Sequence, residues 1–334
     1  MTNLKIKRNH KRKISTLTIL FTILLLSSFF IYSFLSSQNN ISEVNSTIED
    51  NISSRIISSN SPDSDSVTTL SISSLDYTSL SYSERLGILF NNNYLIDDRI
   101  KIYLGDEIDN IGLIYYNLEN NTCININDNM EFIAASTYKV GLNLYAYYLN
   151  SIGQLDLNEY IEYLPEDYEE GTGILQYEYY IDSYSIQELL DLSLIYSDNI
   201  ATNMLGRYLG GHEEVRKNLY NLLKIDFNSS ENIITPAIEY KILKCIYEYS
   251  YYPNFKHMLS VLTQSEYNDR LTKYIDENIV AHKIGTYDTY IHDVGIVFDN
   301  SPYIIILYTH DLEDAEEKIA NISNALYQYN NLTY

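Results

Sequence analysis

The sequence predicts an α+β fold, in which an antiparallel sheet takes strands from both ends of one domain and a helical subdomain is inserted between them. Three observations support this prediction. Two β-rich segments, 111–118 and 122–127, flank a turn-forming Glu-Asn-Asn and predict a hairpin. Three further β-rich segments lie near the C terminus. Between the two groups, apolar residues recur at the three- and four-residue spacing of helices.

The 334 residues divide into four parts by composition. Segment 1–13 is basic, which predicts a cytoplasmic location, and the nearly unbroken apolar run 14–35 has the length of a membrane span. Residues 36–75 are rich in Ser and Asn and predict a disordered linker, whereas residues 76–334 form the expected domain. We therefore expect an extracellular domain held at the cell membrane by one N-terminal anchor, or secreted if the run is a cleaved signal.

Charge and cysteine content exclude several classes of function. The formal net charge is -23 although segment 1–13 is basic, so the domain would repel phosphate and we expect no nucleic-acid partner. Cys123 and Cys245 are expected to be isolated buried thiols, with a disulfide as the alternative outside the cell. They lack nearby His clusters, so we expect no zinc, and no motif predicts another metal or an organic cofactor. The sequence leaves the oligomeric state open.

The helical middle of the domain is delimited by local signals. From Ser136 the apolar residues follow the helical period. Ser185 and Glu188 form a predicted capping box, which begins a helix that stops at Ser-Asp-Asn, residues 197–199. A further helix follows and ends at the Gly-Gly pair 210–211, because glycine readily adopts the backbone conformation that terminates a helix.

The C-terminal part returns to strands. A helix is expected after Pro236, and segments 279–285, 290–298 and 303–310 predict three strands, the last two joined by the turn sequence Asp-Asn-Ser-Pro. A final helix is expected after Asp311, with an apolar stripe suited to packing against a sheet.

A serine and a lysine three positions apart stand at the head of the first of these helices. Ser136 and Lys139 would share one helical face, and in a dry site the pKa of the amine falls, so that it can accept the serine proton. The free amides of a helix N-terminus also suit a developing oxyanion. The spacing thus fits a nucleophile and its base. Taken alone, it is better explained by an N-cap serine with a lysine that reaches to solvent.

Two further motifs carry similar groups. Ser197, Asp198 and Asn199 stand at a junction between helices, where a hydroxyl and an amide can project into a cleft, although an ordinary helix cap would look the same. Lys283 precedes Ile-Gly-Thr on a predicted strand, where Gly285 would let a ligand approach the backbone closely. The alternative for the last motif is a strand end with one exposed lysine.

In this order the three motifs resemble the signature of the penicillin-recognising serine hydrolases, specifically the class A β-lactamase group: Ser-x-x-Lys, Ser-Asp-Asn, then Lys-Thr-Gly. The flanking sequences "SIQELLDLSLIYSDNIATNMLGRYLGG" (185–211) and "AHKIGTYD" (281–288) extend the resemblance, which covers roughly residues 80–330. It implies a β-lactamase/transpeptidase-like fold and a serine hydrolase domain over residues 76–334.

The resemblance implies a role for each matching catalytic residue. Ser136 would be the acylated nucleophile, and Lys139 its general base or part of the proton relay. Ser197 would pass a proton towards the leaving nitrogen. Lys283 would supply positive charge for the substrate carboxylate and polarise Ser197.

The resemblance also implies a substrate-binding set. Asn199 would bind the side-chain amide of the substrate. The backbone amides of Ser136 and Thr286 would form the oxyanion hole, beside the open strand at Gly285.

The sequence departs from the family pattern in two places. Ile284 replaces a Thr or Ser whose hydroxyl helps to hold the β-lactam carboxylate, and Thr286 lies on the same face of the strand and is a possible replacement. Class A β-lactamases also carry a deacylating glutamate on a loop between Ser-Asp-Asn and a Thr-Pro pair. Here the segment before Thr235 is short and lacks the pattern. Glu231 is the only nearby glutamate, and we favour a solvated loop carboxylate over a catalytic role for it.

Three functions follow from these residues. The first is β-lactam hydrolysis through an acyl-enzyme on Ser136. The second is a penicillin-binding protein or D,D-peptidase-like acyl-transferase that acts on peptidoglycan peptides and deacylates slowly, which the missing glutamate favours. The third is a tethered binding or sensor domain without activity.

Overall fold

The computed structural model describes residues 77–228 and 230–333, and the chain divides into two compact units after Tyr103. The predicted basic segment, apolar run and linker all lie outside these residues. Within the described part, no helix combines the length and the apolar character needed to cross a membrane.

The described part of the first unit contains two short helices that the sequence did not predict. A capping box begins α2 (Tyr82–Leu89): Ser81 Oγ accepts from the backbone amide of Glu84, whose carboxylate accepts from the Ser81 amide. The second helix, α3 (Ile96–Leu104), carries two aspartates in its first turn, where negative charge is favourable.

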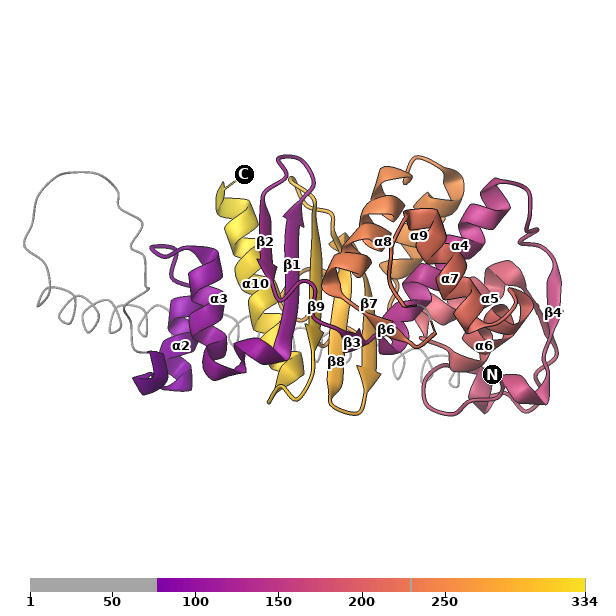
Figure 1. Cartoon of the computed structure of the whole chain (residues 1–334), viewed down its shortest axis with the longest axis horizontal. Helices are drawn as coiled ribbons and strands as arrows, with labels where there is room; N and C mark the ends of the chain where they lie inside the picture. Colours follow the sequence, from indigo (N-terminus) through magenta and orange to yellow (C-terminus); the bar gives the residue numbers. More distant parts are fainter. Residues whose placement is uncertain (1–76, 229, 334) are drawn as a thin grey trace, which may run out of the picture. The chain divides into compact units, whose positions relative to one another are not determined.

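The second unit is built on one antiparallel sheet with the strand order β2-β1-β9-β8-β7 (Figure 1). The N-terminal hairpin and the C-terminal meander meet where β1 pairs with β9, with Leu113 opposite Leu307. The predicted α+β class is therefore confirmed. The strands are β1 (Ile111–Asn117), β2 (Cys123–Ile126), β7 (Val280–Tyr287), β8 (Tyr290–Val297) and β9 (Tyr303–Thr309).

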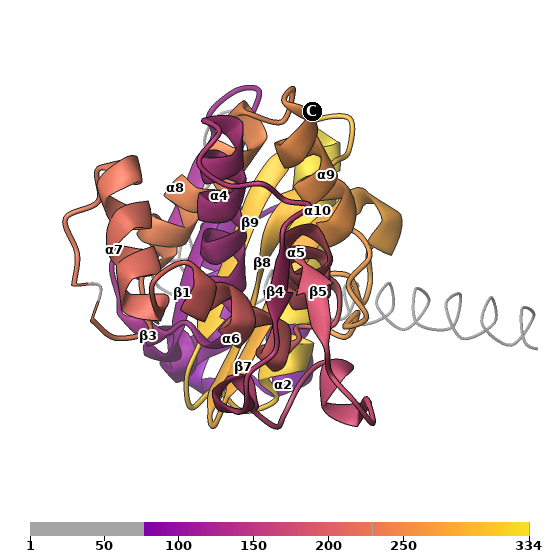
Figure 2. The same ribbon diagram turned by 90° about the vertical axis from the view of Figure 1, so that its right-hand side faces the viewer.

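Helices cover both faces of this sheet. On one face lies α10 (Ala315–Thr333), and on the other lie α8 (Pro236–Glu248) and α9 (Pro253–Leu262) (Figure 1). Figure 2 looks onto the inserted helical subdomain, with the strands of the main sheet behind it. Besides α8 and α9, the inserted subdomain contains the helices α4 (Tyr138–Ser151), α5 (Ile186–Ile195), α6 (Asn199–Tyr208) and α7 (His212–Leu223).

The core lies on both sides of the central strand. Every residue of β9 is buried, including Ile304 on one face and Ile305 on the other, which explains why its sequence is continuously apolar instead of alternating. The predicted stripe of α10 packs here, with Ile319 and Ile322 fully buried.

The predicted helix ends are confirmed. Ser185 and Glu188 form the capping box of α5. After α6, Gly210 and Gly211 adopt φ values of 97° and 105°, a region that favours glycine. Two small sheets complete the unit: β3 (Phe132–Ile133) pairs with β6 (Ile233–Ile234), and β4 (Tyr160–Glu162) pairs with β5 (Ser183–Ser185).

Both cysteines are free thiols, so they form no disulfide. The expectation that both are buried is wrong for Cys123, which is exposed because it stands at the start of the edge strand β2. Cys245 on α8 is half-buried, and burial raises the pKa of its thiol to about 11.

Candidate active site

Ser136 lies in a tight turn just before α4. The turn is a 3-10 helix, Ala135–Thr137, and the α-helix begins at Tyr138, two residues later than the sequence predicted. Ala135 has a left-handed backbone, with φ of 48°. Thr137 is fully buried and donates its hydroxyl proton to the carbonyl of Ala134 at 2.8 Å. This buried hydrogen bond fixes the turn, while Ser136 remains half-exposed.

Lys139 joins the first motif to the second. Its Nζ donates to the Ser197 carbonyl at 2.6 Å and to Asn199 Oδ1 at 2.8 Å, and it lies 3.2 Å from Ser197 Oγ. Burial lowers the pKa of this amine to about 7, although the nearby carboxylates of Asp198 and Glu169 oppose the shift. A substantial fraction of Lys139 is therefore a neutral base near pH 7.

The Ser-Asp-Asn corner is held by its central residue. Ser197 has a left-handed backbone, with φ of 53°. Asp198 caps α6, because its Oδ1 accepts from the Ala201 amide at 2.9 Å. Its Oδ2 accepts from the Leu175 amide at 2.8 Å, which ties the corner to the preceding loop. Asp198 thus fixes the backbone of the corner, while its neighbours Ser197 and Asn199 line the cleft.

Lys283 is not among the residues that line the cleft. Its side chain is fully buried, and Nζ donates to the carbonyl of Ile284 at 3.0 Å. Burial lowers the pKa of this amine well below its usual range, and repulsion from Lys139 lowers it further. The two predicted lysines are therefore close enough to influence each other.

The edge strand β7 packs at Gly285 against the turn that carries Ser136. A Cβ atom there would lie 2.9 Å from the carbonyl oxygen of Ala134 and 3.0 Å from Thr137 Cγ2. Glycine is therefore required by the close approach of two backbones, which places the strand beside Ser136.

Gly285→Ala should consequently disturb the site. Because the Cβ meets backbone, the turn must shift, and a displacement of about 1 Å can cost on the order of 100-fold in rate. We expect the acylation of Ser136 that the family resemblance implies to slow at least tenfold, with a loss of unfolding free energy of about 1–3 kcal/mol from overpacking. Stopped-flow acylation and urea unfolding measure the two effects. An unchanged acylation rate would show that the turn does not depend on this contact.

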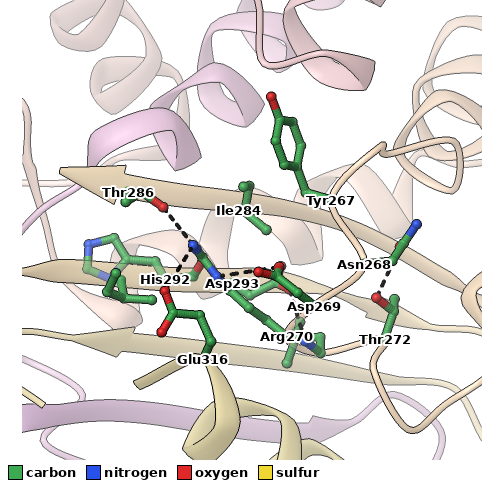
Figure 3. A network of polar contacts seen from close by, with 12 residues as sticks. Tyr267, Asn268, Asp269, Arg270, Thr272, Ile284, Thr286, His292, Asp293 and Glu316 are labelled. Carbon is green, nitrogen blue, oxygen red and sulfur yellow. Dashed lines mark hydrogen bonds and ion pairs between the residues drawn. The ribbon is translucent and has the colours of Figure 1, made fainter. Parts of the chain in front are cut away.

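Arg270 forms hydrogen bonds to two residues of β7 (Figure 3). This buried guanidinium donates from Nη1 to the carbonyls of His292 and Gly285 at 2.7 and 3.0 Å, and from Nη2 to Thr286 Oγ1 at 2.7 Å. Thr286 and Ile284 both line the cleft, as expected for residues two apart on a strand. The Thr286 hydroxyl thus accepts from a buried guanidinium, which also lies 3.9 Å from the carboxylates of Asp269 and Glu316.

Two buried histidines have structural contacts. Nε2 of His292 donates to the Ile133 carbonyl at 2.8 Å, and its Nδ1 accepts from the Thr309 amide at 3.1 Å. Burial lowers the pKa of His292 to about 4, so it is neutral and ties β8 to the segment before Ser136. Nδ1 of His282 lies 2.9 Å from Oδ1 of the buried carboxylate of Asp293.

The predicted residues converge on a cleft of about 560 Å³. Most of them line it, namely Ser136, Lys139, Ser197, Asn199 and Thr286. Glu231 is exposed and is not part of the lining, whereas its neighbour Asn232 is, and donates to the Ala135 carbonyl at 3.2 Å.

The cleft also contains residues that sequence reasoning missed. They come from three other segments and comprise Glu169, Glu170, Thr172, Asn203, His212 and Arg216. The hydroxyl of Thr172 donates to the Ser197 carbonyl at 2.6 Å. The available signal was the Gly-Thr-Gly sequence around Thr172, whose glycines have φ values of 129° and 108° and let the loop lie against the corner.

A sequence profile of the family described as "Beta-lactamase enzyme family" matches residues 96–330. No curated protein sequence matches the chain. The fold is similar to the solved structure of PBP-A, with a TM-score of 0.63 and 22% identity over 70% of this chain and 95% of that one. A variant of PBP-A, solved as an acyl-enzyme complex with penicillin G, has the same score and identity over 70% and 96%. A β-lactamase from Sphaerobacter thermophilus has a TM-score of 0.60 and 21% identity over 66% and 92%.

Proposed function

Because the chain belongs to the beta-lactamase enzyme family and is a β-lactamase-like serine hydrolase, we propose that Ser136 is its nucleophile and carries the acyl group. The contact of Lys139 with Ser197 and Asn199 is the observation that carries this proposal. It joins two distant motifs at one amine, whose pKa of about 7 suits a general base near neutral pH.

In the proposed acylation, neutral Lys139 Nζ accepts the proton of Ser136 Oγ while the oxygen attacks the substrate carbonyl. The carbon–nitrogen bond then breaks, and Ser197 Oγ delivers a proton to the leaving nitrogen. The distance of 3.2 Å between Lys139 Nζ and Ser197 Oγ supports a relay that restores the proton to the serine. We assign the oxyanion hole to the backbone amides of Ser136 and Thr286.

The proposed substrate is a β-lactam, with its carboxylate placed against β7. Thr286 offers a hydroxyl there, whose oxygen accepts from the guanidinium of Arg270 at 2.7 Å. Lys283 adds charge when protonated. Together these groups supply the interaction that Ile284 cannot make. Asn199 Nδ2 would donate to the side-chain carbonyl of the substrate.

A penicillin-binding protein that acts on peptidoglycan peptides is the second candidate. The observation that favours it is the short segment 224–232, which, in its described residues, places no carboxylate in the cleft. We also propose from the sequence an N-terminal membrane anchor with an extracellular domain. That location would suit a protein that acts on peptidoglycan peptides.

One experiment tests the proposed nucleophile and separates the candidates. The full chain is mixed with penicillin G, and its intact mass is followed over time, with peptide mapping of the adduct. We expect one penicilloyl group on Ser136. An adduct that disappears with product release indicates a β-lactamase, and a lasting adduct indicates the second candidate. A chain without any adduct, or with the adduct elsewhere, contradicts the proposal.

A further inference from the structure

A carboxylate from an unexpected segment reaches the cleft. Glu169 lies on the loop that follows the 3-10 turn Pro165–Asp167 and precedes the Ser-Asp-Asn corner. Its Oε2 accepts from Asn203 Nδ2 at 2.9 Å, and its Oε1 accepts from Asn199 Nδ2 at 3.3 Å. Both amides belong to the first two turns of α6, so the carboxylate is held against the corner.

The same amide group links Glu169 to the proposed base. Asn199 accepts from Lys139 Nζ through its Oδ1 and donates to Glu169 through its Nδ2. The negative charge of Glu169 also raises the pKa of Lys139 against the effect of burial. Lys139 and Glu169 therefore lie on either side of one bridging side chain, and both line the cleft that contains Ser136.

The loop that carries Glu169 is anchored to α6. Nε and Nη2 of Arg207 each donate to one oxygen of the buried Asp167 carboxylate at 2.8 Å, a bidentate pair. Asn203 Nδ2 lies 3.2 Å from the Asp167 carbonyl. These contacts, two residues before Glu169, fix the direction in which the loop enters the cleft.

Other groups of the cleft are less suited to activate water. Glu170 also lines it, but its carboxylate accepts only a long contact of 3.4 Å from the hydroxyl of Tyr168, outside the corner. His212 has both ring nitrogens engaged, with Nδ1 3.1 Å from Tyr138 Oη and Nε2 3.1 Å from Asn203 Oδ1. Glu169 is the carboxylate that faces the amides of the corner.

We propose that Glu169 is the general base of deacylation, supplied by the loop before the corner instead of the segment after it. This inference rests on the proposed function, in which Ser136 carries an acyl ester. A carboxylate oxygen of Glu169 accepts a proton from a water molecule as the water oxygen attacks the ester carbonyl. The tetrahedral intermediate then expels Ser136 Oγ, the proton passes back to that oxygen, and the free acid leaves.

The test compares Glu169→Gln with Glu166→Gln in the full chain. Glutamine keeps an acceptor for Asn203 but cannot take up a proton. Glu166 is a matched control, because it is an exposed glutamate three residues before Glu169 and does not line the cleft. Its replacement by glutamine removes the same charge. Acylation and deacylation by penicillin G are measured separately, by rapid-quench and chase mass spectrometry.

In Glu169→Gln we expect deacylation to slow by about 100- to 10,000-fold, the usual contribution of a general base, so that the acyl-enzyme accumulates. Acylation should change less than tenfold, which also shows that the variant is folded. Glu166→Gln should deacylate like the wild type, and Glu169→Asp, which keeps the carboxylate, should recover part of the rate.

Three results would overturn the inference. One is equal deacylation of the wild type and Glu169→Gln, including the case in which neither deacylates. Another is a loss of acylation as large as the loss of deacylation. The third is a Glu170→Gln variant that slows deacylation while Glu169→Gln does not. A wild-type chain that forms no adduct would instead refute the proposed function, so the two failures are distinguishable.

Discussion

Lys139→Met should slow the acylation of Ser136 by about 100- to 10,000-fold, because methionine keeps the length of the side chain but removes the proposed base. In the wild type the acylation rate should rise as the pH increases through about 7 and then level off, since the amine accepts a proton only in its neutral form. Rapid-quench measurements between pH 5.5 and 9 test both statements.

Lys139→Arg is the matched control for this experiment. Arginine retains positive charge but stays protonated over the whole range, so it should be as inactive as methionine and should lose the rise near pH 7. Thermal unfolding must accompany the rates. Removal of a buried amine should change stability little, because its desolvation cost is relieved and Thr172 still donates its single hydroxyl proton to the Ser197 carbonyl at 2.6 Å. A variant that acylates at the wild-type rate would exclude Lys139 as the base.

Glu239→Gln should remove a large pH dependence of stability. Glu239 on α8 is fully buried, and burial raises the pKa of its carboxyl from 4.5 to about 8. The hydroxyl of Tyr308 donates to Glu239 Oε2 at 3.2 Å, and this hydrogen bond lowers the pKa against the larger effect of burial. Tyr308 Oη also lies 2.7 Å from Thr137 Oγ1, so Glu239 is linked to the turn that carries Ser136.

The direction of the effect follows from proton binding. Between pH 4.5 and 8 the folded chain holds a proton on Glu239 that the unfolded chain has lost, so this contribution to stability is complete below pH 4.5 and is lost as the pH rises through about 8. At about 1.4 kcal/mol for each pH unit, the loss is on the order of 5 kcal/mol. Glutamine mimics the neutral acid and should abolish it.

Urea unfolding of both proteins at pH 5, 7 and 9 measures this difference. The wild type should become less stable relative to Glu239→Gln as the pH rises. Glu248→Gln on the same helix is the control, because its carboxylate is exposed and should show no such divergence. Parallel pH curves for the wild type and Glu239→Gln would mean that Glu239 is ionised throughout.

The elements predicted from the sequence are those with long local signals. The three C-terminal strands and α10 are long enough for their apolar patterns to be unambiguous. The strands β4 and β5, of three residues each, are too short to leave a pattern. The helix α9 did carry a signal, Pro253 at its first position, which the prediction did not use.

The site was predictable where the residues that act together belong to one short motif. Ser136 and Lys139 are joined by helical spacing, and Ser197 and Asn199 by one corner, so their separation in sequence indicates their arrangement. Glu169 lies 34 residues before Asn203, its hydrogen-bond donor. Arg270 likewise reaches Thr286 only after the chain has folded. Such pairings depend on how loops are placed, which no local pattern of residues describes.

The left-handed backbones of Ala135 and Ser197 bear on any attempt to engineer this domain. A residue with a Cβ atom holds that conformation at a cost of about 1–2 kcal/mol, which glycine avoids. A screen for heat resistance would therefore favour glycine at both corners. The gain would come with freer rotation of the peptide units beside Ser136 and at Ser197. Thermal robustness and reactivity are thus opposed at these two positions.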